Sequence, residues 1–296
     1  MRKNNLKILI LFLTLITLSF IPIKNCFCTE IDLYESREIQ YKSITIDRNL
    51  DSYSNQELVK LSSQQENDLR EYLLSNHSKI EKTGVFNVYY KNLKSIVNAL
   101  NNNDLYFDDF ADDGNPNLLK KLNLSFTNIE SRYKIIAPKN NIIELIWIGD
   151  GFLEFNIDYC YLANYYSEYL NESWQKFLNN KKNILDGLKH CTYATGGGVT
   201  KDALTCAKWV ICWENFLKEY PNFELKDEVL QDINIFTSCV LYWRKDIIDY
   251  DEKTNKQVLR KNIQNACEYF LENASRDNSG YDYIKTEYAN LKKQYQ

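Results

Sequence analysis

Apolar residues recur at helical spacing along most of the second half of the chain. Positions three and four apart lie on one face of a helix, so such a stripe predicts an amphipathic helix packed against a core. Stripes of this kind occur over residues 162–169, 174–188, 229–247 and 259–270, and helices are also predicted at residues 200–220 and over the polar segment 281–296. The pattern therefore predicts a helical bundle over residues 159–296.

Polar residues and glycines divide these stripes into separate helices. Asn171 precedes the second stripe and can cap its helix, with Glu172 placed well against the helix dipole. The three glycines at 196–198 indicate a flexible hinge, and Thr200 is the predicted cap of the helix that follows. Pro221 stops that helix from continuing far.

The first half of the chain has a weaker, mixed pattern. Residues 58–61 predict one short helix and residues 69–80 a second. Residues 85–90 are β-branched and aromatic, which predicts a strand, and residues 93–100 again show helical spacing. Residues 29–158 are therefore predicted to form a mixed α/β region.

The clearest strand pattern lies at the end of this region. It predicts strands at residues 133–137, 142–148 and 152–157. The dipeptide Asp150-Gly151 indicates a tight hairpin turn, because glycine tolerates the positive φ of such turns. We therefore predict a fold that is α+β and mostly α, in which a three-stranded antiparallel meander is followed by a cysteine-containing helical bundle.

The hairpin turn also predicts the pairing of the last two strands. If Gly149 pairs with Phe152, Trp147 faces Glu154 across the sheet. Residues opposite each other share a face. The face that carries Trp147 and Glu154 is then mixed, which suits a half-exposed surface, and the face that carries Ile148 is apolar and should pack on the core.

The first 28 residues have the organisation of a secretory signal peptide. Basic residues precede an apolar run at 8–23, and Cys26 and Cys28 are small residues at alternate positions after it. The run has 16 residues, fewer than the about 20 that a transmembrane helix needs. We predict a signal peptide at residues 1–28 and a secreted or periplasmic protein, with an uncleaved leader that anchors the chain as the alternative.

The net charge of the chain limits which classes of partner it can bind. The whole chain carries 36 basic and 40 acidic residues, a formal net charge of −4. Removal of residues 1–28 takes away four basic residues and no acidic ones, so the mature chain carries a net charge of about −8. This balance argues against a nucleic-acid partner and against membrane contact beyond the N-terminal leader.

Six cysteines follow the leader, and all are candidates for disulfide bonds. They are Cys160, Cys191, Cys206, Cys212, Cys239 and Cys267. An even number of cysteines in an exported protein favours disulfides, but the sequence does not resolve which residues pair. Buried free thiols are the alternative, because cysteine packs as a small hydrophobic residue.

The sequence predicts neither a metal site nor a cofactor. Cys206 and Cys212 are spaced too widely for a zinc motif. The acidic loop at 104–117 has the carboxylates and the glycine of a calcium loop. If Gly114 held the sixth loop position, however, Ala111 and Lys120 would stand where oxygen ligands are required. We therefore expect a solvated turn there.

Motifs of common enzymes do not occur in the sequence. His190 adjoins Cys191, but sequence neighbours rarely point at each other as a nucleophile and its base must. Residues 196–201 lack the spacing of a phosphate-binding loop, and there is no Gly-x-Ser-x-Gly or His-Glu-x-x-His motif. No catalytic residue is assigned from sequence.

Trp147, Glu154 and Asp158 are the candidate ligand-binding residues. Aromatic rings stack on sugars, and a pair of carboxyl groups can hydrolyse a glycosidic bond. Glu154 and Asp158 would be roughly 13 Å apart along a strand. This is too far for the carboxyl pair of a retaining glycosidase and for that of an inverting one. A solvated sheet face is the alternative.

The favoured function is a soluble binding or interaction module outside the cytoplasm, with a protein or a glycan as its partner. Predicted export, the missing catalytic motifs, the acidic balance and the 14% aromatic content support it. Two alternatives stay open. One is an envelope-directed hydrolase that acts on glycan through carboxylates, and the other is a membrane-anchored structural component of the envelope.

Overall fold

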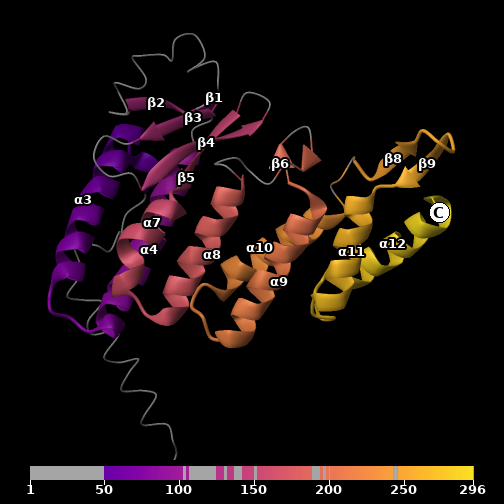
Figure 1. Ribbon diagram of the computed structural model, residues 1–296. Helices are drawn as coiled ribbons and strands as arrows, with labels where there is room; N and C mark the ends of the chain where they lie inside the picture. The colour runs from indigo at the N-terminus through magenta and orange to yellow at the C-terminus, as the bar shows by residue number, and fades with distance from the viewer. Residues whose placement is uncertain are drawn as a thin grey trace, which may run out of the picture. The chain divides into compact units, whose positions relative to one another are not determined.

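The computed structural model describes residues 50–102, 105–106, 125–129, 132–136, 142–149, 152–188, 194–195, 198–199, 201–242, 244 and 246–295. The chain divides into two compact units, Met1–Ile46 and Asp47–Gln296, and all described residues belong to the second. These residues are mostly helical, with small antiparallel sheets (Figure 1). The predicted mostly α fold with a minor β part is confirmed at this level, and the predicted division at residue 158 stays a prediction.

Two long helices, α3 (Asn55–Leu74) and α4 (Lys79–Asn101), pack against each other. At the start of α4 the Ser78 hydroxyl accepts a hydrogen bond from the backbone N–H of Glu81. The Glu81 carboxylate in turn accepts one from the N–H of Ser78. An equivalent capping box begins α3. These side chains satisfy backbone donors that a helix N-terminus leaves without intrahelical partners.

Two predictions for this region are wrong. α3 continues without a break to Leu74, so residues 58–61 and 69–80 are not separate short helices, and residues 85–90 lie inside α4. The side chains of that run are typical of strands, but they continue the helical spacing of residues 93–100 and are buried: Val85, Phe86, Tyr89 and Tyr90. Burial of one helix face outweighs the local strand propensity here.

The main sheet has three antiparallel strands in the order β1 (Leu105–Tyr106), β5 (Phe152–Ile157), β4 (Ile143–Gly149). Strands β2 (Ser125–Ile129) and β3 (Arg132–Ile136) form a separate hairpin. The predicted hairpin of β4 and β5 is confirmed. The predicted meander is not found among the described strands, because β3 pairs with β2 and the second neighbour of β5 is β1, a strand distant in sequence.

The register of the β4–β5 hairpin also differs from the prediction. Gly149 pairs with Phe152 as expected, but an irregularity between Trp147 and Gly149 shifts the pairing by one residue beyond it. Glu154 consequently pairs with Ile146 and not with Trp147. Because a bulge places one extra residue in a strand, it moves the following residues to the opposite face relative to their partners. The prediction that Trp147 and Glu154 lie opposite each other on one mixed face is therefore wrong.

Six further helices occupy the second half of the chain as far as the structure describes it. They are α7 (Tyr159–Tyr166), α8 (Glu172–Leu188), α9 (Ala203–Glu219), α10 (Lys226–Val240), α11 (Lys261–Asn273) and α12 (Tyr281–Tyr295). Figure 1 shows them packed against one another, and α9 contacts α8, α10 and α11. This packing agrees with the predicted helical bundle. None of the helices in the described ranges is long and apolar enough to cross a membrane.

The starts of two helices test the predicted caps. Asn171 caps α8 as predicted, since its side-chain oxygen accepts a hydrogen bond from the N–H of Trp174. The cap of α9 is Asp202, which accepts a hydrogen bond from the N–H of Thr205, and not Thr200 as predicted. A carboxylate at this position also favours the positive end of the helix dipole.

Short hairpins and 3-10 turns connect the helices. Two-residue strands β6 (Ala194–Thr195) and β7 (Gly198–Val199) pair around the predicted glycine hinge. α10 ends at Val240, so the stripe predicted to continue to residue 247 is too long, and the chain enters the hairpin of β8 (Ile248–Asp251) and β9 (Lys256–Leu259). Two 3-10 turns complete the described elements, at Leu50–Ser52 and Ser167–Tyr169.

The core of the helical part is a cluster of aromatic rings. Neighbouring rings meet mostly edge to face or tilted, with centroids 5.0 to 6.3 Å apart, as their quadrupoles favour. The cluster joins α4, α8, α9 and the turn before α10, and its members are buried: Phe86, Tyr90, Trp174, Phe177, Trp213, Phe216 and Phe223. It accounts for seven of the 41 aromatic residues of the chain as core packing.

A partly buried ion network centred on Glu228 of α10 adds a polar link between helices. The Glu228 carboxylate accepts hydrogen bonds from Tyr90 (2.8 Å) and Lys94 (2.7 Å) of α4 and lies 3.0 Å from the Lys181 ammonium of α8. Lys181 also contacts Asp232 at 2.7 Å. Burial alone would raise the pKa of Glu228, but Lys181 and Lys94 lower it to about 2. The network therefore holds a carboxylate ionised inside the protein.

Candidate functional site

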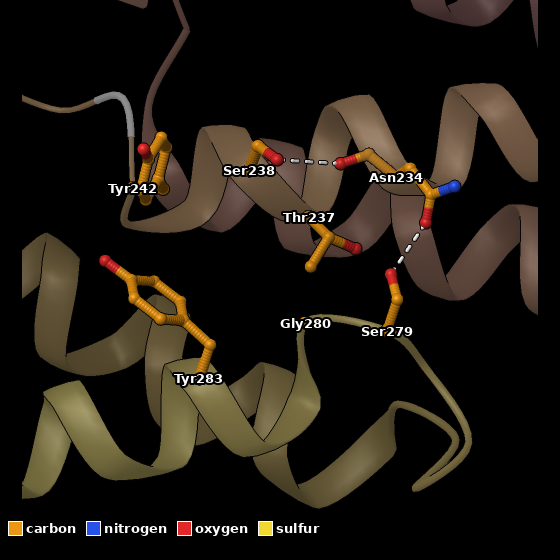
Figure 2. A pocket seen from close by; sticks show the side chains of 7 residues that line it. All are labelled: Asn234, Thr237, Ser238, Tyr242, Ser279, Gly280 and Tyr283. Atoms are coloured by element: carbon orange, nitrogen blue, oxygen red, sulfur yellow. Dashed lines mark hydrogen bonds between the residues drawn. The ribbon is translucent and has the colours of Figure 1, made fainter.

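A pocket of about 320 Å³ lies between the C-terminal half of α10 and the start of α12. This volume falls at the lower end of the range for small-ligand sites. Figure 2 shows the lining side chains, with two tyrosine rings at one end and polar side chains at the other. The seven lining residues are Asn234, Thr237, Ser238, Tyr242, Ser279, Gly280 and Tyr283.

Hydrogen bonds to a buried side chain of the core hold the loop that forms one wall of the pocket. Glu214 of α9 is buried, and its carboxylate accepts hydrogen bonds from the backbone N–H of Ser275 (2.8 Å) and the side-chain amide of Asn278 (3.0 Å). The Asn278 oxygen then accepts a hydrogen bond from the N–H of Gly280 at 2.9 Å. This chain of bonds positions the pocket wall before any ligand arrives, which lowers the entropic cost of binding.

A close approach of two elements also shapes the pocket. A Cβ atom placed on Gly280 would lie 2.3 Å from the Cγ2 methyl of Thr237 on α10. No side chain fits at that distance, so glycine is required where α12 begins. The start of α12 therefore lies directly against α10.

The polar end of the pocket offers hydrogen-bond donors and acceptors without charge. The Ser279 hydroxyl donates to the side-chain oxygen of Asn234 at 2.7 Å, and the Ser238 hydroxyl donates to the Asn234 backbone carbonyl at 3.0 Å (Figure 2). The first bond orients the Asn234 amide. Hydroxyl and amide groups of this kind pair well with the hydroxyl groups of a ligand.

The aromatic end of the pocket consists of Tyr242 and Tyr283. Their ring centroids are 5.7 Å apart with an edge-to-face angle of 69°. Tyr242 is 64% exposed and Tyr283 is 43% exposed, unlike the buried aromatic rings of the core. Two adjacent exposed tyrosines combine apolar ring faces with hydroxyl groups, a combination that is enriched at binding surfaces.

The chemistry of this lining supports binding and provides no acid–base pair. None of the seven lining residues is charged, and none is histidine or cysteine. General acid–base catalysis needs a group that titrates near the working pH. In the part of the chain that the structure describes, no cluster of three or more metal-ligating side chains occurs either.

The residues predicted from sequence to bind a ligand lie elsewhere. Trp147 is in β4 and Glu154 in β5, where the Asn101 amide lies 3.5 Å from the Glu154 carboxylate. Burial raises the pKa of Glu154. Asp158 is buried and caps α7, since its carboxylate accepts a hydrogen bond from the N–H of Tyr161 at 2.9 Å. The structure therefore does not gather these three residues into the pocket, and Asp158 has a structural role.

The described cysteines are free thiols. Cys206, Cys239 and Cys267 are buried, Cys212 is exposed, and Cys160 is half-buried with its thiol 3.2 Å from the Asp186 carboxylate. The remaining candidate, Cys191, lies outside the described residues together with His190, and so does the acidic loop at 107–117. The disulfides predicted from sequence therefore stay a prediction.

Reasoning from sequence did not find the pocket. Its residues come from the end of α10 and, some forty residues later, from the loop before α12 and the first turn of α12, and none belongs to a recognisable motif. The run Asn278-Ser279-Gly280-Tyr281 has the composition of a turn. That composition indicates a loop, but it does not indicate which helix the loop contacts.

Comparison with known proteins gave no match for this chain. No protein-family model matches it, and neither the curated proteins nor the solved structures contain a significantly similar chain. Inferences about function therefore depend on the geometry of the site.

Proposed function

We propose that the protein is a non-catalytic binding module that acts outside the cytoplasm and recognises a neutral carbohydrate through the pocket of α10 and α12. The observation that carries the proposal is the pair of exposed rings, Tyr242 and Tyr283, beside an uncharged wall of amide and hydroxyl groups. Sugars present apolar C–H faces and hydroxyl edges, so rings and amides bind complementary parts of one ligand.

The absence of charge from the lining supports a neutral ligand. A site for an anionic sugar or a phosphate normally places arginine or lysine side chains against the charge. No charged residue lines this pocket. Action outside the cytoplasm depends on the predicted leader at residues 1–28, and N-terminal sequencing of the native protein tests that part separately.

The test is a binding titration with a panel of neutral oligosaccharides built from glucose, galactose, mannose or N-acetylglucosamine. Isothermal titration calorimetry should detect saturable binding of at least one of them. Replacing either ring, Tyr242→Ala or Tyr283→Ala, should weaken the affinity about tenfold, because exposed tyrosines at a contact centre are worth about 1.4 kcal/mol or more. Tyr242→Phe keeps the ring and should lose less.

A matched control separates this site from general changes in the surface. Tyr250 of β8 is 54% exposed and does not line the pocket, so Tyr250→Ala should leave the affinity unchanged. The proposal fails if no saccharide in the panel binds, or if the bound saccharide is insensitive to both pocket variants. Hydrolysis of a bound saccharide would instead favour the alternative of a carboxylate-dependent hydrolase, which Glu154→Gln would then test.

A further inference from the structure

Two buried cysteines face each other between α9 and α10. Cys206 lies in the first turn of α9 and Cys239 in the last turn of α10, and both side chains are fully buried. The Arg244 guanidinium contacts both residues, and each thiol is the strongest influence on the pKa of the other. A disulfide requires two cysteines whose side chains lie against each other, and these two buried side chains meet where α9 packs on α10.

A buried arginine lies at the same place. The Arg244 guanidinium donates to the backbone carbonyl of Cys239 at 2.8 Å and to that of Lys201, and it lies 3.9 Å from the sulfur of Cys206. Its side chain is 1% exposed. The guanidinium therefore fixes the end of α10 beside the start of α9 and brings a positive charge to the Cys206 sulfur.

This environment favours the thiolate of Cys206. The hydrogen bond from Cys239 and the charge of Arg244 lower the pKa of Cys206, although burial opposes them, and the position in the first turn of α9 acts in the same direction. Cys206 is therefore the more acidic thiol of the pair in the folded protein. By contrast, burial raises the pKa of Cys267 to about 12, so that thiol is poorly reactive.

We propose that Cys206 and Cys239 are joined by a disulfide bond that links α9 to α10 in the mature protein. In the oxidation the Cys206 thiolate attacks an oxidant of the disulfide class, such as oxidised glutathione, and a mixed disulfide forms as one glutathione thiolate leaves. Cys239 then loses its proton and attacks the Cys206 sulfur, and the second glutathione leaves as a thiolate. The chain loses two electrons and two protons, and one oxidised glutathione becomes two reduced molecules.

Because both cysteines are buried, the disulfide must form while the protein folds. Both sulfurs are inaccessible in the folded protein, so an oxidant reaches them only before α9 and α10 have packed. The predicted export gives the chain an oxidising compartment at that stage. The proposal is independent of carbohydrate binding, because neither cysteine lines the pocket.

The test is oxidative refolding of the reduced full chain in a mixture of reduced and oxidised glutathione. The refolded protein is denatured with an alkylating reagent, digested with trypsin without reductant, and analysed by mass spectrometry. Cleavage after Lys208 separates Cys206 from Cys212 on the sequence. The expected product is peptide 202–208 linked to peptide 227–244, with loss of both alkylated thiols.

Variants then separate the pair from other cysteines. Cys206→Ser should leave Cys239 fully alkylated, and both Cys206→Ser and Cys239→Ser should melt at a temperature that reductant does not change. The wild type and the control Cys212→Ser should both melt at a lower temperature in reductant. Alkylation of both residues in the refolded wild type would overturn the proposal, and so would a linkage of either one to Cys191 or Cys267.

Discussion

The contact between Gly280 and Thr237 provides a sharp test of how the pocket is built. In the variant Gly280→Ala the added Cβ would lie 2.3 Å from the Thr237 Cγ2 methyl, whereas carbon atoms in contact normally lie about 3.5–4.0 Å apart. Thr237 is buried in α10, and its β-branched side chain has little rotational freedom there. The start of α12 must therefore move, at a cost of about 1–3 kcal/mol.

A second substitution removes the cause of this cost. Thr237→Ser deletes the Cγ2 methyl and keeps the hydroxyl that lies 3.3 Å from the Asn278 amide. The nearest remaining atoms to the new Cβ are then the Cβ of residue 237 and the Asn278 oxygen, each at an ordinary contact distance of 3.6 Å. Gly280→Ala should consequently cost about 1–3 kcal/mol less in the Thr237→Ser background than in the wild type.

Urea denaturation of the four proteins, followed by far-UV circular dichroism, measures this difference. The cycle cancels the intrinsic effect of alanine on the helix start, because that effect is common to both backgrounds. Equal destabilisation by Gly280→Ala in the two backgrounds would refute the reasoning. So would a neutral effect of Gly280→Ala in the wild type, since it would mean that α12 does not lie against α10 as described.

Three further predictions concern the rest of the fold. Glu228→Gln should destabilise the protein by about 3–5 kcal/mol in urea denaturation at pH 7, because it leaves the Lys181 ammonium partly buried without its full counter-charge. The Glu228 pKa falls from an ordinary value of 4.5 to about 2 in the folded state, so its stabilisation, about 3 kcal/mol, is present above pH 4.5 and is lost as the pH falls toward 2. A stability profile between those pH values should therefore be flatter in Glu228→Gln, and an identical slope would contradict the assignment. Ser78→Ala should cost about 1 kcal/mol through loss of the α4 cap, whereas Ser95→Ala, at an exposed mid-helix position, should change stability by less than about 0.5 kcal/mol.

Helices were predictable from sequence where their buried face follows a local period. Val229, Ile233, Phe236 and Val240 are spaced by three or four residues, and all four are buried in α10. Residues 85–90 have the composition of a strand over a short window, although they lie inside α4. The helical period becomes evident only when that run is joined to residues 93–100.

The register of the β4–β5 hairpin and the position of the pocket could not be predicted, because local sequence patterns do not contain the contacts that determine them. The turn at Asp150-Gly151 fixes the pairing of Gly149 with Phe152, but nothing in that turn reports the irregularity after Trp147. The pocket requires the loop before α12 to return to α10. Glu214 directs that return from α9 through a hydrogen bond to Asn278, and no sequence spacing encodes this contact.

The same bond provides a way to test the proposed binding separately from folding. Asn278 and Gly280 connect the pocket wall to the buried Glu214 carboxylate, so substitutions along that path change stability together with the shape of the site. Tyr242 and Tyr283 are exposed at the rim, so truncation of either side chain leaves no cavity in the core. Variants at the rim should therefore alter affinity at unchanged stability, and variants along the internal path should alter both. A ligand that binds the folded pocket must in turn stabilise the packing of α12 on α10, since it binds the folded state alone.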